Sequence, residues 1–225
     1  MTDRRVAFGA GNGGSAAQVA SVFETPVIVE QLRDAAAMNA ALKTLILAKM
    51  ESDPGIAISN VGGWHSDTQM LEWGGPTARD LCVRIIAAAD RFTVDIRAKE
   101  TPRHKWFPEM WANVSPPGAF NSHHSHPGAF WSAVYYVDDG YAGSSDKELG
   151  GELILFDPRM PMIRMTAPDL RFRRPGQPAD HDENRMRPAS GRLVIVPAWL
   201  NHAVRPYQGN GLRISIAVNL TPVPV

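Results

Sequence analysis

The strongest constraint on the fold of this chain is the change in pattern after about residue 92. From there, short β-rich runs follow one another and are separated by Gly, Pro and Asn. Short strands with turn signals and no helical pattern between them favour an antiparallel sandwich or barrel over a parallel α/β sheet. A double-sheet jelly roll is one such fold. The predicted strands are 92–96, 105–114, 130–137, 153–156, 193–196 and 212–219.

Two helices are predicted ahead of these strands. In 35–51 the apolar residues follow helical spacing, and the sequence SDPG then ends the helix. A second helix begins at Pro76, because the first helical position needs no amide donor. Its apolar face contains Leu81, Ile85, Ala88 or Ala89, and Phe92. The stretch 19–32 predicts a strand and then a bend. We therefore expect a mainly β fold with the two helices packed on the outside of one sheet.

The length of 225 residues suits one well-buried domain, which we place at 19–225. Residues 1–18 have basic residues but no apolar segment after them, so they predict a flexible leader and not a signal peptide. The Pro-, Arg- and Met-rich segment 158–190 predicts a long insertion loop. Loops of this length are typically lids, oligomer contacts or disordered insertions.

Charge and composition exclude several classes of partner. Lys plus Arg and Asp plus Glu number 23 each, which gives no electrostatic case for nucleic acid or for an anionic membrane. No apolar run approaches the roughly 18 residues of a membrane span. The single cysteine, Cys82, cannot form an internal disulfide and is expected as a buried thiol. These features predict a cytoplasmic protein, with a homodimer as the default oligomer.

The sequence NSHHSHPGAF, at 121–130, places three of the seven histidines within four positions. In an extended strand, side chains two residues apart share a face, with Cα atoms about 6.6 Å apart. His124 and His126 would then converge on one metal ion, while His123 points the other way. Neutral imidazole is a ligand for iron, zinc, copper or nickel. The alternative is a surface turn that happens to be rich in histidine.

Two later segments favour a metal site over a surface turn. His202 follows an apolar strand and could supply a third ligand from across the barrel. Arg213 opens the strand RISIAVNL, where a buried guanidinium is costly unless it meets an anion. Its planar set of donors fits a carboxylate bidentately. Ser215 shares its face, and Tyr136 could bond the same anion. The alternatives are a structural salt bridge for Arg213, strand polarity for Ser215 and core packing for Tyr136.

This ordered set of motifs resembles the iron(II)- and 2-oxoglutarate-dependent dioxygenases. The set runs from His-x-His-Pro through SAVYYV and GGELILFDPR to the distal histidine and RISIAVN. WANVSPPGAFNSHHSHPGA and GGWHSD also resemble a bacterial group of these oxygenases, so the likeness spans most of the chain. The resemblance implies a double-stranded β-helix, which is a cupin-like jelly roll. Fe(II) would lie at its open end, with 2-oxoglutarate as cosubstrate.

The resemblance also implies roles for individual residues. His124 matches the first histidine of the family motif, and His202 matches the distal one. Arg213 matches the basic residue that binds the far carboxylate of 2-oxoglutarate, and Ser215 completes an Arg-x-Ser pattern. The chain departs from the family where His126 replaces the usual carboxylate. A carboxylate could also come from elsewhere in the sequence, and the candidates are Asp138, Asp139, Glu152 and Asp157.

Three functions remain open from the sequence. The leading one is an oxidoreductase in which His124, His126 and His202 hold Fe(II), and 2-oxoglutarate and O₂ serve to hydroxylate an unactivated C–H bond. Its substrate would be a small molecule or a protein side chain. The second is a cupin-like three-histidine metalloenzyme that does not use 2-oxoglutarate. The third is a binding module without catalysis. Succinate formation separates the first from the second, and metal-dependent melting tests the third.

The remaining histidines and aromatic residues carry weaker expectations. Surface positions are expected for His65, His104 and His181. Packing roles are expected for Trp64, Trp106, Trp111 and Trp199. Trp131 could touch substrate, and polar positions beside the site are expected for Asn113 and Asn121.

Overall fold

The computed structural model describes residues 22–98, 101–160, 167, 169–172, 176, 178–179 and 181–225. The predicted leader, 1–18, lies outside these residues. The helices are α1 (Ala35–Ser52), α2 (Met70–Trp73) and α3 (Gly75–Asp90), with a short 3₁₀ helix at Lys147–Leu149. The strands are β1 (Ile28–Gln31), β2 (Asn60–Val61), β3 (Trp64–His65), β4 (His104–Ser115), β5 (Phe120–His124), β6 (Trp131–Asp138), β7 (Leu153–Phe156), β8 (Glu183–Met186), β9 (Arg192–Pro197), β10 (His202–Val204) and β11 (Arg213–Pro224).

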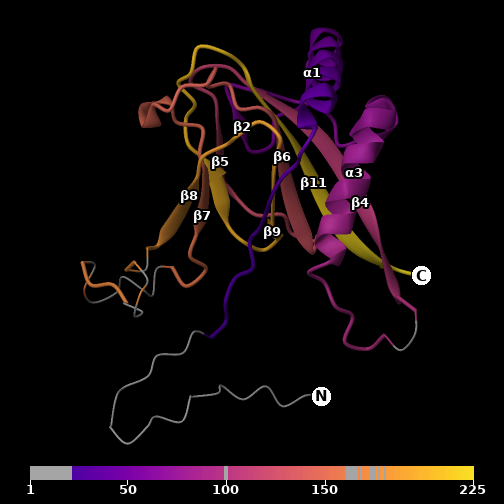
Figure 1. Ribbon diagram of the computed structural model, residues 1–225, viewed down its shortest axis with the longest axis vertical. Helices are drawn as coiled ribbons and strands as arrows, with labels where there is room; N and C mark the ends of the chain where they lie inside the picture. The colour runs from indigo at the N-terminus through magenta and orange to yellow at the C-terminus, as the bar shows by residue number, and fades with distance from the viewer. Residues whose placement is uncertain are drawn as a thin grey trace, which may run out of the picture.

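The strands form two antiparallel sheets that face each other. The large sheet has six strands in the order β1-β9-β6-β11-β4-β3, and the small sheet has five in the order β2-β5-β10-β7-β8. In Figure 1 the small sheet, with β5, β7 and β8, lies to the left of the large sheet. Strands that are distant in sequence are neighbours, because β11 pairs with both β4 and β6. The predicted antiparallel two-sheet architecture is therefore confirmed.

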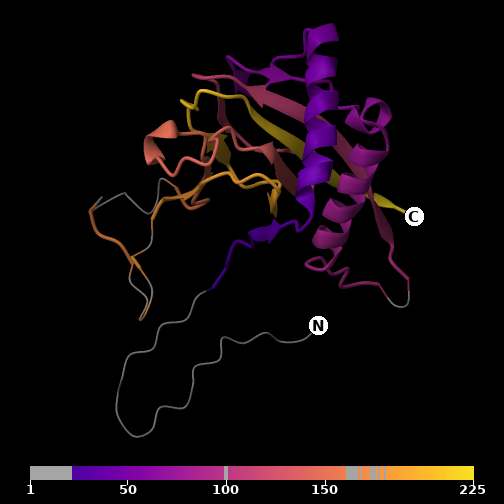
Figure 2. The same ribbon diagram turned by 45° about the horizontal axis from the view of Figure 1, so that its top comes forward.

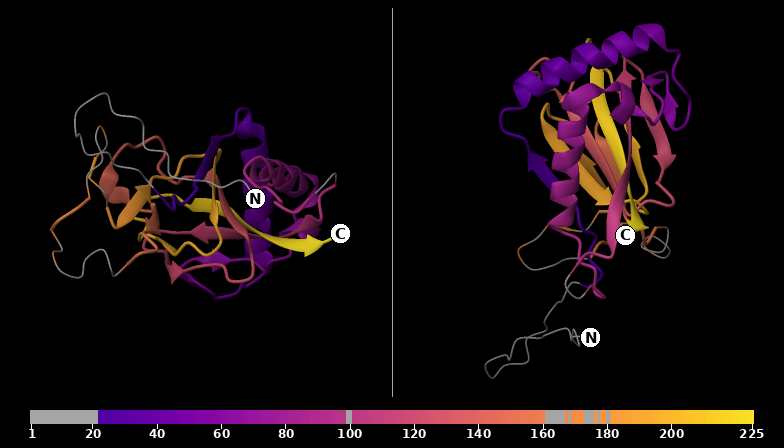
Figure 3. Two further views of the ribbon diagram at one scale, coloured as in Figure 1. Left: turned by 90° about the horizontal axis from the view of Figure 1, so that it is seen from below. Right: turned by 90° about the vertical axis from the view of Figure 1, so that its right-hand side faces the viewer.

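The helices cover the outer face of the large sheet, as predicted. Figure 2 shows α1 and α3 side by side over β11 and β4, and Figure 3 shows the helices on one side and the small sheet on the other. Pro76 lies in the first turn of α3, as its missing amide donor predicts. None of the helices in the described part of the chain is long and apolar enough to span a membrane.

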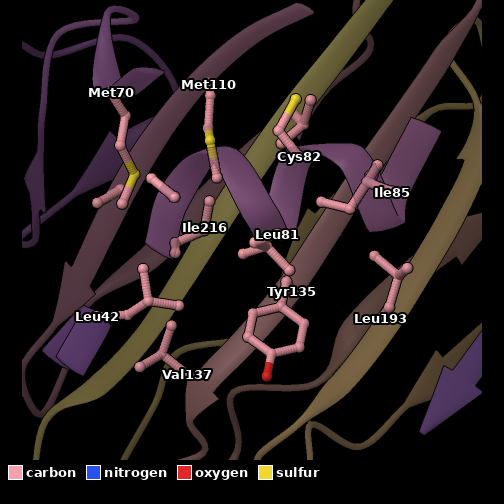
Figure 4. Close-up of a cluster of buried hydrophobic side chains, with 14 of the residues drawn as sticks. Leu42, Met70, Leu81, Cys82, Ile85, Met110, Tyr135, Val137, Leu193 and Ile216 are labelled. Carbon is pink, nitrogen blue, oxygen red and sulfur yellow. The ribbon is translucent and has the colours of Figure 1, made fainter. Parts of the chain in front are cut away.

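The main hydrophobic core lies between these helices and the large sheet (Figure 4). Leu42 and Ile46 lie one turn apart on α1, and both are fully buried. Leu81 and Ile85 repeat this spacing on α3. Strands contribute alternate residues to the same core. These strand residues include Met110, Tyr135, Val137, Leu193 and Ile216. Cys82 is buried in this layer, and burial raises the pKa of its thiol to about 11.

Several predicted elements differ from the structure. The predicted strand 92–96 is not a strand, and Phe92 lies beyond the end of α3 and is 60% exposed. The predictions missed the short polar strands β5, β8 and β10. Of these, β8 lies inside the segment 158–190 that was expected to be a loop. It pairs with β7, from Leu153 opposite Met186 to Phe156 opposite Glu183.

Candidate active site

A cavity of about 440 Å³ is lined by side chains from both sheets. On the large sheet, the register places the lining residues in rows that cross β4, β11 and β6. We name each row by its β11 residue. The Ser215 row holds Asn113, Ser215 and Tyr136; the Ala217 row holds Trp111, Ala217 and Val134; and the Asn219 row holds Glu109, Asn219 and Ser132.

Three histidines meet on the small-sheet side of this cavity. His124 ends β5, and it lies opposite His202, the first residue of β10. His126 lies two residues beyond the end of β5, and its backbone amide donates to the Ala198 carbonyl at 2.8 Å. The assigned strand thus ends at His124, one residue earlier than an extended pair of histidines needs. The His124 and His126 rings nevertheless lie with their centroids 5.1 Å apart, so the two side chains converge as expected.

The spacing of the ring nitrogens fits a single metal ion. One ring nitrogen from each of His124, His126 and His202 lies within 4.8 Å of the others. The Nε2 atoms of His126 and His202 are 3.2 Å apart. Two imidazole nitrogens that each lie about 2.1 Å from one metal ion, at roughly 90–109° to each other, are separated by about 3.0–3.4 Å. The pair already stands at the separation that coordination requires.

Backbone carbonyls orient two of these rings. Nδ1 of His202 lies 2.8 Å from the Leu200 carbonyl oxygen, and Nδ1 of His124 lies 2.6 Å from the Ser122 carbonyl oxygen. Because a carbonyl only accepts, each Nδ1 carries the proton and each Nε2 presents a lone pair. Such a partner on the second nitrogen is typical of metal-binding histidines.

The cluster is neutral at physiological pH. Burial, and secondly the charge of neighbouring histidines, lowers the pKa of His126 to about 3. Burial also lowers the pKa of His202 to about 4 and shifts that of His124 downward. Neutral imidazole is the form that binds a metal ion.

His65 and Trp111 form a wall behind the cluster. The His65 ring stacks on Trp111 with centroids 5.6 Å apart, and Trp111 packs against His126 at 5.9 Å. His65 is only 3% exposed and lines the cavity, so its predicted surface position is wrong. The stacked rings restrict how far the His126 ring can turn.

Arg213, Ser215 and Tyr136 lie together at the other side of the cavity. Arg213 is 1% exposed, and its Nε has no hydrogen-bond partner among the described residues. Its guanidinium carbon lies 5.2 Å from the centre of the Tyr136 ring. The Tyr136 hydroxyl is likewise buried without a partner in the described part of the chain. Ser215 lies directly across the sheet from Tyr136.

These groups form a donor site for an anion. Burial raises the pKa of Tyr136, and the charge of Arg213 offsets this only in part, so the phenol keeps its proton and donates. A side chain at Gly151 would approach the Arg213 side chain, because a Cβ there would lie 3.3 Å from the Arg213 Cδ. Gly151 also has a φ of 80°, a conformation that favours glycine.

Residues 109–219, which reach from β4 to β11, match the family model described as "Putative 2OG-Fe(II) oxygenase". The matched range contains the three histidines, Arg213, Ser215 and Tyr136. Over this range, which is just under half of the chain, the protein resembles the superfamily of 2-oxoglutarate- and Fe(II)-dependent oxygenases. It is an oxidoreductase, and Fe(II) and 2-oxoglutarate are its cofactors. No curated protein sequence matches the chain.

Solved structures of such oxygenases share the fold. A prolyl hydroxylase of Trichoplax adhaerens, solved with a peptide fragment of hypoxia inducible factor, has a TM-score of 0.59 and 12% identity; the match covers 87% of this chain and 83% of that one. A Pseudomonas putida prolyl-4-hydroxylase has a TM-score of 0.54 and 18% identity. That match covers 88% of this chain and 92% of the hydroxylase. HygX of Streptomyces hygroscopicus, solved with nickel and 2-oxoglutarate, has a TM-score of 0.56 and 14% identity. That match covers 88% of this chain and 83% of HygX. The predicted double-stranded β-helix is thereby confirmed.

The candidate site has no carboxylate among its possible metal ligands in the described residues. The acidic residues considered from the sequence have other partners. Asp138 accepts from Lys43 at 2.7 Å, and the Asp139 carboxylate accepts from Ser190. Glu152 lies 3.8 Å from Arg205, and Asp157 pairs with Arg159. In this structure the third member of the metal-binding group is His126 and not an acid.

Two of the expectations for tryptophan residues are wrong, whereas those for the asparagines and for two of the remaining histidines agree with the structure. Trp131 lies in the core under the helices, where its indole donates to Thr93 at 2.8 Å, so it does not face the cavity. Trp199 is 55% exposed and does not pack. Asn113 and Asn121 both line the cavity, as expected. His104 and His181 are exposed, as expected.

The sequence interpretation missed Glu109 and Asn219, which also line the cavity. Glu109, Trp111 and Asn113 alternate along β4, so the period of two was the signal that could have identified that face. The predicted strand 105–114 already contained it.

Proposed function

We propose that the protein hydroxylates an unactivated C–H bond of its substrate, with Fe(II) held by His124, His126 and His202. The overall reaction converts substrate, 2-oxoglutarate and O₂ into hydroxylated substrate, succinate and CO₂. The observation that carries the proposal is the pairing, in one cavity, of three neutral convergent histidines with a buried guanidinium that has no anionic partner among the described residues.

The histidines supply three donors on one side of the metal position. Fe(II) and 2-oxoglutarate, when bound, supply the oxidising chemistry, and the chain supplies orientation and a shielded cavity. Three neutral ligands do not reduce the charge of the metal ion, whereas a carboxylate would. We therefore expect this centre to attract the negatively charged cosubstrate more strongly than the usual centre does.

Arg213, Ser215 and Tyr136 would bind the far carboxylate of 2-oxoglutarate. A carboxylate accepts two parallel bonds from a guanidinium, and the Tyr136 hydroxyl, which has no partner among the described residues, would be a third donor. Binding would also give the buried Arg213 the counter-charge that it lacks, which removes a cost of several kcal/mol, in order of magnitude, for an unpaired buried charge. The carboxylate is therefore the ligand that best fits this end of the cavity.

Apolar side chains shield the space between the two groups. Val134 and Ala217 form the Ala217 row with Trp111, Val194 of β9 lies beside this row, and Val196 lies beside Ser132 in the next row. These walls limit water near the metal position, which strengthens the electrostatic contacts inside the cavity.

Succinate formation tests the proposal. The full chain with Fe(II), 2-oxoglutarate and O₂ is expected to release succinate slowly even without substrate. Arg213→Met is expected to raise the KM for 2-oxoglutarate about a hundredfold, as for the loss of a charged bidentate contact. His181→Gln, an exposed histidine, is the matched control and leaves the rate unchanged.

Two results would contradict the proposal. Iron binding without succinate would favour the three-histidine metalloenzyme that does not use 2-oxoglutarate. Succinate formation that survives His202→Ala would show that the reaction occurs elsewhere.

A further inference from the structure

The Asn219 row has no role in binding the metal or 2-oxoglutarate. Its members Glu109, Asn219 and Ser132 lie side by side across β4, β11 and β6, and all three line the cavity. The row is six residues along β11 from Arg213, which corresponds to about 20 Å in an extended strand. The cavity therefore has a cationic end at Arg213 and an acidic end at Glu109, and these are its two charged lining residues other than histidine within the described part of the chain.

The acceptor atoms of this row lack partners. Glu109 forms no ion pair and no side-chain hydrogen bond with any described residue, although it is half-buried. The Oδ1 atom of Asn219, directly opposite Glu109, is buried and has no partner there either. A buried acceptor without a donor is costly, at about 1–3 kcal/mol. Two adjacent acceptors, one of them charged, call for a donor that carries positive charge.

Glu109 is not part of the metal site in this structure. The group of side chains that could hold a metal ion contains the three histidines and does not extend to Glu109 within the described residues. Glu109 is nevertheless near that site. It lies two residues from Trp111, about 6.7 Å along the strand, and the Trp111 ring packs against His126. A ligand held at Glu109 would therefore extend past Trp111 toward the histidines.

We propose that Glu109 and Asn219 form the subsite that recognises the substrate of this oxygenase through a positively charged nitrogen. The inference rests on the proposed function and names the class of substrate: a molecule or side chain with an ammonium or guanidinium group joined to an alkyl segment. The carboxylate of Glu109 and the Oδ1 of Asn219 accept from the nitrogen. Val134 and Ala217 contact the alkyl segment and direct its C–H bonds toward the histidines.

The test measures binding to the full chain with Fe(II) and 2-oxoglutarate under anaerobic conditions, so that no turnover occurs. The probes are two pairs of α-N-acetyl amides that differ in charge but little in shape, those of L-arginine with L-citrulline and of L-lysine with L-norleucine, so that the side-chain nitrogen is the one cationic group. Calorimetry is expected to show that each cationic probe binds about tenfold or more tightly than its neutral partner, as a charge-assisted contact implies. The free L-amino acids, all four of which carry an α-ammonium group, show whether the source is a free amino acid or a peptide side chain, according to which form binds more tightly.

Glu109→Gln is expected to abolish the preference for the cationic probes and to leave the affinity for 2-oxoglutarate within about twofold, because the Arg213 end is unchanged. Glu51→Gln, at an exposed position near the end of α1, is the matched control and keeps the preference. Circular dichroism and melting of each variant confirm folding.

The outcomes separate this inference from the proposed function. Equal binding of charged and neutral probes, or a preference that survives Glu109→Gln, would overturn the subsite while 2-oxoglutarate binding stands. If Glu109→Gln instead weakens Fe(II) binding and leaves the probe preference intact, Glu109 serves the metal centre and the subsite is wrong. Failure of the wild type to bind 2-oxoglutarate would overturn the proposed function itself.

Discussion

The two faces of the large sheet differ in whether the chain itself supplies hydrogen-bond partners for a buried tyrosine hydroxyl. Tyr135 and Tyr136 are neighbours on β6 and are both fully buried, but they point to opposite faces. On the helix side, the Tyr135 hydroxyl donates to Asn39 at 2.6 Å. On the cavity side, the Tyr136 hydroxyl has no partner in the described residues. The fold itself supplies the hydrogen-bond partner on the first face, and it supplies none for Tyr136 on the second within the described residues.

A core substitution on the helix side is expected to have the largest effect on stability. Ile216→Ala removes a fully buried side chain of β11 and leaves a cavity under the helices. The free energy of unfolding should fall by about 2–5 kcal/mol. Urea denaturation measures this, and the affinity of the folded fraction for 2-oxoglutarate should remain near that of the wild type. A loss of affinity larger than the loss of stability would mean that the two faces are not independent.

The cavity side is expected to respond in the opposite way. Arg213→Met replaces a buried charge that lacks an anionic partner among the described residues with an apolar side chain of similar length. Removal of such a charge should leave stability unchanged or raise it by about 1–4 kcal/mol, while 2-oxoglutarate binding is lost. Denaturation of the ligand-free variant is the measurement. A fall in stability of the size expected for Ile216→Ala would show that Arg213 supports the fold.

The adjacent tyrosines allow the two faces of the sheet to be compared by removing a single hydroxyl oxygen from each face. Tyr135→Phe leaves Asn39 without its donor and should cost about 1–3 kcal/mol of stability. Tyr136→Phe removes a hydroxyl that has no partner in the described chain, so stability should not fall. Its expected effect is a weaker affinity for 2-oxoglutarate, by about 1 kcal/mol, or roughly fivefold. The interpretation of the two faces fails if the two variants have the same stability.

A further difference between the two faces is expected in their response to pH. The folded-state pKa values of His126 and His202, about 3 and about 4, lie below the unfolded value near 6.5. The unfolded chain therefore binds more protons as the pH falls below about 6.5, and the metal-free protein loses stability there. Its melting temperature should fall between pH 7 and pH 5 by about 2–4 °C for each kcal/mol lost.

Matched variants isolate the contribution of the cluster. His202→Gln should reduce this pH dependence, whereas His181→Gln, at an exposed position, should not. Equal slopes for the wild type and His202→Gln would show that the buried cluster does not cause the dependence.

The fold was predictable where a single segment carried its own pattern. The predicted strand 153–156 coincides with β7, and the alternation in 130–137 separated Tyr135 from Tyr136 correctly. The pattern failed for β5, which is rich in polar residues, and for β10, which has only three residues; the two strands pair with each other. It also failed at 92–96, where the β-branched residues have no partner strand among the described residues.

The members of the candidate site were predictable, but part of its geometry was not. His124, His126 and His202 were proposed by residue type, whereas the position of His126 beyond the end of β5 involves a contact with Ala198 from a distant loop. His65 was missed because β3 has only two residues and gives no periodic signal. Glu109 was missed because a single acid on an amphipathic strand resembles an ordinary exposed position until the register places it opposite Asn219.

The central claim is that the three histidines and Arg213 together hold an iron–2-oxoglutarate pair. The most direct measurement is an anaerobic titration of the full chain with Fe(II) and then 2-oxoglutarate, followed by the visible charge-transfer absorption of chelated iron. We predict a band that is absent in His202→Ala and weaker in Arg213→Ala at the same ligand concentration. Tight iron binding with no band on addition of 2-oxoglutarate would contradict the account.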